Sequence, residues 1–201
     1  MDSMGKIAEE IKRRERFLLV GHIIPDGDCI GSLIALYLGL RSLGKQVEMV
    51  LEDPVPDIYS FLKGSAEIRR PKEMNSYGQG QEAVIFLDCS EVSRAGSFAS
   101  EVLKGGPLVI NIDHHESNEL YGHLNHVDHT SASTAELVYR LLKELEVDID
   151  SSIASAVYAG IVQDTGSFRH TNTTGQTFRT AAELLESGAN LQQIKVNLFE
   201  S

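Results

Sequence analysis

The chain has 201 residues, of which 42% are hydrophobic and 23% are charged, enough for one domain with a sizeable core. Its 29 acidic and 18 basic side chains give a net charge of −11, which argues against a protein that grips a long nucleic-acid duplex by its backbone. A site for a short or single nucleotide is compatible with this charge. Because no apolar run could span a bilayer and no signal peptide is apparent, we expect a cytoplasmic protein without a membrane partner.

Strand and helix patterns alternate through the first two thirds of the chain. Short apolar runs bounded by turn residues predict strands over 17–20, 47–51, 66–69, 83–87 and 108–112. Helical patterns cover 7–14, 29–43, 58–62, 94–103, 133–146, 150–163, 174–186 and 191–199, whereas 72–81 and 122–129 are expected to be irregular. The pattern predicts an α/β fold with a mostly parallel five-stranded sheet, helices on both faces and a helical C-terminal portion.

Three local signals mark helix ends in this pattern. Asp28 is placed to cap the helix that follows it, which is apolar nearly all round and should be buried. Ser131 or Ser133 is expected to cap the helix that follows, and Glu136 stands three residues after Ser133, as in a capping box. Phe168 is expected in a short extended piece after the helix that ends near Asp164.

Acidic and imidazole side chains follow several of the predicted strands. In open α/β sheets, ligands bind beyond the carboxyl ends of the strands, so these side chains should meet there. A further carboxylate, Asp164, precedes a Thr-Gly bend that could turn it back toward the sheet. The residues that follow the strands are His22, Asp26, Asp28, Asp88, Asp113, His114 and His115.

Four carboxylates in one pocket repel one another and are costly to bury, so something must offset their charge. Two divalent cations would do so, and oxygen ligands with one or two imidazoles suit manganese or magnesium better than zinc. Such a pair of ions polarises a phosphoryl oxygen and lowers the pKa of a water between them. A lone aspartate after a strand is more often a cap or a turn, so the prediction depends on the combination.

Five segments of the sequence together resemble the DHH phosphoesterase family: GHIIPDGDCIGS, LDCS, NIDHHESN, SASTAEL and GIVQDTGSFRHTNTT. Within that family the similarity is to the bacterial branch of oligoribonucleases and 3′-phosphoadenosine-5′-phosphate (pAp) phosphatases. The resemblance extends from Phe17 to Leu198.

The resemblance implies a role for each matching residue. His22 and Asp26 would bind one metal ion, whereas Asp28, His114 and Asp164 would bind the other. Asp88 would bridge the two ions, with Mn²⁺ as the first expectation and Mg²⁺ or Co²⁺ as alternatives. His115 would contact the phosphate and protonate the leaving oxygen. Asp113 would bind the free ring nitrogen of His114 and thereby orient that ring.

The activity implied by the resemblance is hydrolysis of very short oligoribonucleotides from one end and of pAp-like nucleotides. The alternatives are a cyclic dinucleotide phosphodiesterase, a pyrophosphatase and, from another class, a nucleotide-binding module without turnover. Residues 1–190 would form the catalytic domain and 191–201 the start of a linker to a C-terminal substrate-binding domain. A homodimer is left open.

Other polar residues have weaker assignments. Arg94, Arg169 and Ser133 are candidates for contact with a substrate phosphate, with surface charge and helix capping as the competing readings. Three histidines at 123, 126 and 129 could suggest a further metal site, but solvated loop histidines are the favoured interpretation. Cys29 and Cys89 are expected to be small buried residues.

Overall fold

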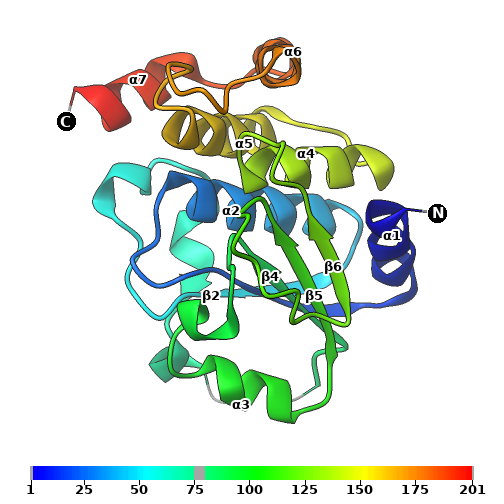
Figure 1. Ribbon diagram of the computed structural model, residues 1–201. Coiled ribbons are helices and arrows are strands. Elements are labelled where there is room, and N and C mark those ends of the chain that lie inside the picture. The colour runs from blue at the N-terminus through cyan, green and yellow to red at the C-terminus, as the bar shows by residue number, and fades with distance from the viewer. Residues whose placement is uncertain (1, 75–79, 201) are drawn as a thin grey trace.

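A parallel sheet lies at the centre of the computed structural model, which describes residues 2–74 and 80–200 (Figure 1). Within those residues the sheet has six strands in the order β3-β2-β1-β4-β5-β6, and every neighbouring pair is parallel. The strands are β1 (Arg16–Val20), β2 (Gln46–Val50), β3 (Ile68–Arg69), β4 (Ala83–Leu87), β5 (Leu108–Asp113) and β6 (Leu124–Val127).

The five strands predicted from the sequence are all present, but the prediction missed β6. This strand, Leu124–Val127, lies in a segment expected to be irregular and pairs with the end of β5. It is an edge strand, only partly buried, and it carries Asn125 and His126 in place of an apolar run. Its existence therefore depends on pairing with β5, which a local pattern does not reveal.

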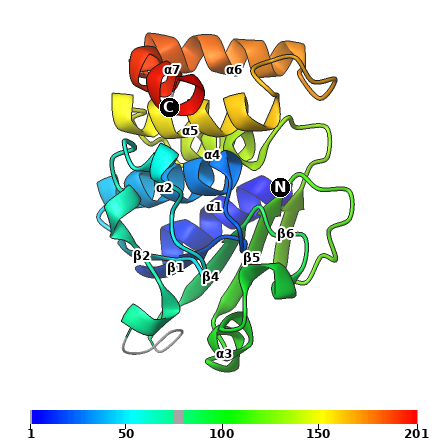
Figure 2. The same cartoon turned by 90° about the vertical axis from the view of Figure 1, so that its left-hand side faces the viewer.

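Helices cover both faces of the sheet, as predicted (Figure 1). One face carries α1 (Ser3–Arg13) and α2 (Gly27–Ser42), with α4 (Thr134–Glu144) beside α2, whereas α3 (Ala99–Lys104) packs on the other face. A further layer is formed by α5 (Ser151–Asp164) on α2, and α6 (Gly175–Glu186) and α7 (Leu191–Phe199) lie outermost (Figure 2). Among the described helices, none is long and apolar enough for a membrane crossing.

The position of α2 explains its apolar sequence. Alternate residues of β1 face opposite sides, so Phe17 and Leu19 join the core beneath α2, whereas Leu18 and Val20 face α3. On its other side α2 packs against α5 so closely that a Cβ on Gly31 would lie 2.4 Å from the carbonyl oxygen of Ala156. A helix between a sheet and another helix has little solvent-facing surface, and most residues of α2 are buried as predicted.

Several short elements differ from those predicted from the sequence. The helix expected over 94–103 is a 3₁₀ turn at Val92–Ala95 and the short α3, separated at Gly96, whose φ is 107°. The helix expected over 58–62 is a 3₁₀ turn at Asp57–Tyr59, and further 3₁₀ turns occupy Ser65–Glu67 and Pro71–Glu73. Phe168 is in a turn with a φ of 64°, not in extended backbone. Of the loop expected over 72–81, residues 75–79 lie outside the described part of the chain.

The strand order reverses between β1 and β4. From β1 the chain continues to β2 and β3 on one side, and then returns to β4 and β5 on the other. The loops that leave the carboxyl ends of β1 and β4 therefore diverge, which is where open α/β sheets bind their ligands.

Candidate metal centre at the carboxyl ends of the strands

The loop after β1 brings His22, Asp26 and Asp28 to the start of α2. Asp26 is the N-cap of this helix, because its Oδ1 accepts hydrogen bonds from the backbone N–H groups of Asp28 (3.0 Å) and Cys29 (3.1 Å). The prediction that Asp28 caps the helix was therefore wrong. Asp28 lies in the first turn, where its side chain is free to reach α4.

The fully buried Asp28 carboxylate lies at the N-terminus of α4. It accepts hydrogen bonds from the backbone N–H groups of Thr134 (2.7 Å) and Ala135 (2.8 Å). The hydroxyl of Thr134 donates to Oδ1 of Asp88 at 3.0 Å. The N-terminus of α4 thus binds the carboxylates of Asp28 and Asp88. The partial positive charge of a helix N-terminus favours negative charge at this position.

Ser133 caps α4 as predicted, with its hydroxyl accepting from the N–H of Glu136 at 3.1 Å. The return bond of a capping box is not made, because the buried Glu136 carboxylate pairs with Arg140 at 2.8 Å. The Ser133 side chain is fully buried and serves as this cap.

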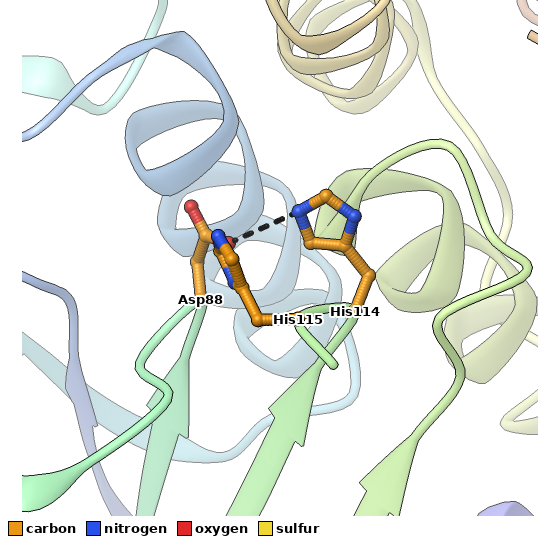
Figure 3. Close-up of side chains that lie close together, drawn as sticks. All are labelled: Asp88, His114 and His115. Carbon is orange, nitrogen blue, oxygen red and sulfur yellow. Dashed lines mark ion pairs between the residues drawn. The ribbon is translucent and has the colours of Figure 1, made fainter. Parts of the chain in front are cut away.

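Six of the predicted side chains converge beyond the ends of β1, β4 and β5. Nε2 of His22 lies 3.3 Å from Oδ2 of Asp88 and 3.7 Å from Oδ1 of Asp26. Nε2 of His114 lies 3.0 Å from Oδ2 of Asp164 and 3.8 Å from Oδ2 of Asp28. Asp88 lies close to both histidines, because its Oδ1 is also 3.7 Å from Nε2 of His114 (Figure 3).

These contacts define groups that could each hold a metal ion. One group is His22, Asp26 and Asp88, a second is Asp28, His114 and Asp164, and a third is Asp88, His114 and His115. Within each group the potential ligand atoms lie within 4.8 Å of one another. The first two groups contain the residues that the family resemblance assigned to the two ions, with Asp88, the expected bridge, in the first group.

The electrostatics reflect the crowding of carboxylates. Burial, together with the charges of Asp88 and Asp164, raises the pKa of Asp28 well above its usual value, and burial likewise raises the pKa of Asp164. Burial alone would lower the pKa of His114, but Asp164 and Asp88 raise it to about 9. The raised pKa values mean that this cluster of carboxylates favours bound positive charge, whether it comes from protons or from cations.

The donor groups fit divalent cations. Nδ1 of His22 donates to the carbonyl of Ile23 at 2.7 Å, which leaves Nε2 as the ring nitrogen that faces Asp88 and Asp26. Nε2 of His114 is buried and, although close to Asp164, makes no aligned hydrogen bond. Carboxylate oxygens with one imidazole in each of the first two groups, and no thiolate, match manganese or magnesium.

Asp113 holds the ring of His115. The prediction that Asp113 orients the ring of His114 was wrong. Oδ1 of Asp113 accepts from Nδ1 of His115 at 2.7 Å and from the backbone N–H of His114 at 2.8 Å. Oδ2 of Asp113 accepts from Asn118 at 2.7 Å. The His114 ring points instead toward Asp28 and Asp164, so only its main chain reaches Asp113.

The sequence prediction gave no role to Asn118 and did not place Thr134 beside Asp88. Nδ2 of Asn118 contacts Asp113, the side-chain oxygen of Asn111 and, at 3.3 Å, the carbonyl of Cys89. The only signal available was the position of Asn118 within the NIDHHESN segment. Cys29 and Cys89 are fully buried free thiols, as expected.

The remaining candidates lie around this centre. Arg94 and Arg169 are exposed, and the carbonyl of Arg94 accepts from the N–H of Ile23 at 2.7 Å, beside His22. Arg169 lies in the turn after Asp164. Nδ1 of His123 accepts from the N–H of Val109, and Nδ1 of His126 pairs with the hydroxyl of Ser3. Among the described residues, no candidate metal group includes a histidine at 123, 126 or 129.

Comparison with known proteins identifies the chain's relatives. It is 39% identical over 194 residues to the bifunctional oligoribonuclease and PAP phosphatase NrnA of Thermus thermophilus, covering 96% of this chain and 57% of that protein. It is 27% identical over 195 residues to a probable manganese-dependent inorganic pyrophosphatase of Streptococcus agalactiae, covering 92% of this chain and 60% of that one. The chain thus spans less than two thirds of these relatives.

A solved structure shares the fold closely. The crystal structure of an exopolyphosphatase-related protein from Bacteroides fragilis superposes with a TM-score of 0.92 and is 25% identical, covering 99% of this chain and 60% of that one. The model of the DHH family N-terminal domain matches residues 16–161, which include every residue of the centre except Asp164. The chain therefore belongs to the DHH family.

Proposed function

We propose that the chain is a metal-dependent phosphoesterase that hydrolyses short oligoribonucleotides and pAp-like nucleotides. The observation that carries the proposal is the pair of ligand groups that meet at Asp88 where the strand order reverses. The similarity to the Thermus oligoribonuclease and PAP phosphatase supports the substrate class. The division into a catalytic unit over 1–190 and a linker over 191–201 is part of the same proposal.

The proposed ligands are His22 and Asp26 for one ion, and Asp28, His114 and Asp164 for the other, with Asp88 shared. Bound manganese ions would neutralise these carboxylates, polarise a phosphoryl oxygen and lower the pKa of a water molecule. The manganese-dependent pyrophosphatase among the relatives supports the choice of metal.

His115 is the proposed acid for the leaving oxygen. Its side chain is 47% exposed, and Asp113 holds its Nδ1, which leaves Nε2 as the nitrogen available to a substrate. Its Nδ1 also lies 3.6 Å from Oδ1 of Asp88, so the ring is adjacent to both ligand groups. A proton held on Nε2 would pass to the leaving oxygen as the phosphoester bond breaks.

The test is a panel of substrates with the purified chain and Mn²⁺: a 5′-phosphorylated diribonucleotide, pAp, a cyclic dinucleotide and pyrophosphate. We expect release of mononucleotide from the first and of phosphate from pAp. Replacing a metal ligand should lower activity by more than the roughly 10–100-fold loss typical of residues that support a ligand. The activity of D88N should therefore be more than about 100-fold below that of the wild type. D148N is the control, because Asp148 is exposed and lies in the connection between α4 and α5.

The outcomes separate the candidate functions. Turnover of pyrophosphate alone would indicate a pyrophosphatase, and turnover of the cyclic dinucleotide alone would indicate a cyclic dinucleotide phosphodiesterase. Either result would refute the proposed function. Nucleotide binding without metal-dependent turnover would favour a binding module. Equal activity of D88N and wild type would remove the metal centre from the mechanism.

A further inference from the structure

Ile24 has an unusual backbone for its residue type. Its φ is 52°, in the left-handed region, and it precedes Pro25. A β-branched residue is an outlier there, and a following proline further disfavours helical conformations. The residue is 80% exposed, so the protein itself gains little apolar burial from it.

Hydrogen bonds of Ile24 itself and of the residue before it hold this backbone in place. The N–H of Ile24 donates to Oδ2 of Asp53 at 2.8 Å. The preceding residue, Ile23, donates its N–H to the carbonyl of Arg94 at 2.7 Å and accepts from His22 at 2.7 Å. Strained residues that the surrounding structure fixes in this way concentrate at functional sites, so the exposed side chain calls for a ligand.

The position of Ile24 defines what it could touch. It lies midway between His22 and Asp26, with its Cα within about 7.6 Å of the Cα of each, since neighbouring Cα atoms are 3.8 Å apart. Both neighbours belong to one ligand group of the metal centre. An organic group attached to a phosphate at that centre would therefore lie near the loop that carries Ile24.

We propose that Ile24 packs against the nucleoside attached to the bound phosphate and thereby favours nucleotides over inorganic phosphates. The inference rests on the proposed function and adds a residue that determines specificity. The flat face of a base and the C–H groups of a ribose offer apolar surface that Ile24 can cover, whereas phosphate and pyrophosphate offer none. Affinity for a nucleotide should therefore depend on this side chain, and affinity for inorganic phosphate should not.

The test is calorimetric titration of the manganese-loaded protein with AMP and, separately, with inorganic phosphate. I24N keeps a residue that tolerates left-handed backbone but removes the apolar surface. It should weaken AMP binding by about tenfold, the effect of losing burial of part of one aliphatic side chain, and leave phosphate binding unchanged. I24L should retain most of the affinity for AMP, and I24G provides a second variant that relieves the strain.

The matched control is L43N. Leu43 is also an exposed aliphatic residue, but it caps the opposite end of α2, about 24 Å from Asp26 for a 16-residue helix. L43N should bind both ligands as the wild type does. Because I24N and I24G remove strain, both should unfold at a temperature no lower than that of the wild type.

Three results would overturn the inference. The first is equal weakening of AMP and phosphate, the second is a wild type that binds AMP no more tightly than phosphate, and the third is a parallel loss of Mn²⁺ affinity. A wild type that binds AMP through Ile24 but does not hydrolyse the diribonucleotide would instead refute the proposed function and leave this inference standing.

Discussion

Nδ1 of His115 lies 2.7 Å from Oδ1 of Asp113, whose other oxygen accepts from Asn118 at the same distance. Burial alone would raise the pKa of Asp113, but the hydrogen bonds from His115 and Asn118 lower it. The carboxylate is therefore ionised and can only accept, which requires the proton of His115 to be on Nδ1 in its neutral form. Asp113 thus fixes both the orientation and the tautomer of this ring.

The variant D113N tests this arrangement, because an amide nitrogen would face either His115 or Asn118 with the wrong polarity. We expect kcat for the diribonucleotide to fall by about 10–100-fold, as is usual for partners of this kind, with a smaller change in KM. Steady-state kinetics would measure the split, and D148N is again the control. An unchanged kcat in a folded D113N would show that His115 needs no such support.

Metal binding should stabilise the fold through Asp164. A cation that binds only the folded chain adds about 2.7 kcal/mol to the free energy of unfolding at 100 times its dissociation constant. D164N removes one carboxylate of the second ligand group and should show a smaller increase on addition of Mn²⁺.

Thermal unfolding in EDTA and in Mn²⁺ would measure the effect. In EDTA, D164N should be at least as stable as the wild type, because burial already disfavours the charged form of Asp164. D148N should respond to Mn²⁺ as the wild type does. An equal response in D164N would exclude this residue from the ligands.

The sequence predicted which strand ends carry the site, because Asp88 and His114 follow short apolar runs that are typical of buried strands. It assigned the helix cap to Asp28 where the structure has Asp26, since both occupy positions from which a carboxylate can reach the start of α2. Only the approach of α4 decides the matter, through the N–H groups of Thr134 and Ala135. Contacts of this kind join residues more than 100 positions apart and leave no local pattern.

The same limit applies to β6 and to Asn118. The residues of β6 are polar enough for a loop, and they form a strand because β5 offers a free edge. Asn118 resembles an ordinary turn residue until the turn folds back on Asp113. Predictions from apolar periodicity therefore identified the buried strands, whereas edge pairing and polar contacts required the structure.

His126 should make the stability of the fold depend on pH. Burial lowers its pKa, and its Nδ1 pairs with the hydroxyl of Ser3 at 2.8 Å. Below the unfolded pKa of about 6.5 the unfolded chain takes up a proton that the folded chain does not. The contribution of neutral His126 is thus complete above about pH 6.5 and is lost progressively as the pH falls toward the folded pKa.

Urea unfolding at pH 7.5 and pH 5.5 would test this in H126Q, which lacks the titrating ring. Between these two values the wild type should lose up to about 1.4 kcal/mol relative to H126Q for each pH unit below 6.5. S3A removes the hydrogen-bond partner but keeps the histidine, so it should retain the pH dependence of the wild type. A constant difference between wild type and H126Q at both pH values would contradict the prediction.

The close contact between α2 and α5 predicts a strong effect of one methyl group. In G31A the added Cβ would meet the carbonyl oxygen of Ala156 at 2.4 Å, and both groups belong to rigid helix backbone. The helices must move apart, which should lower the free energy of unfolding by about 1–3 kcal/mol, the usual cost of overpacking. Because α2 carries Asp28 and α5 carries Asp164, the same displacement should weaken Mn²⁺ binding.

G175A is the matched control. Gly175 begins α6, and an added Cβ would meet only the end of the flexible Arg179 side chain, at 3.6 Å. Its backbone also suits an L-residue, so G175A should gain about 0.4–1 kcal/mol through the lower entropy of the unfolded chain. Urea unfolding and Mn²⁺ titration of both variants would measure the contrast. If G31A were as stable as G175A, the two helices would have to lie further apart than the structure describes.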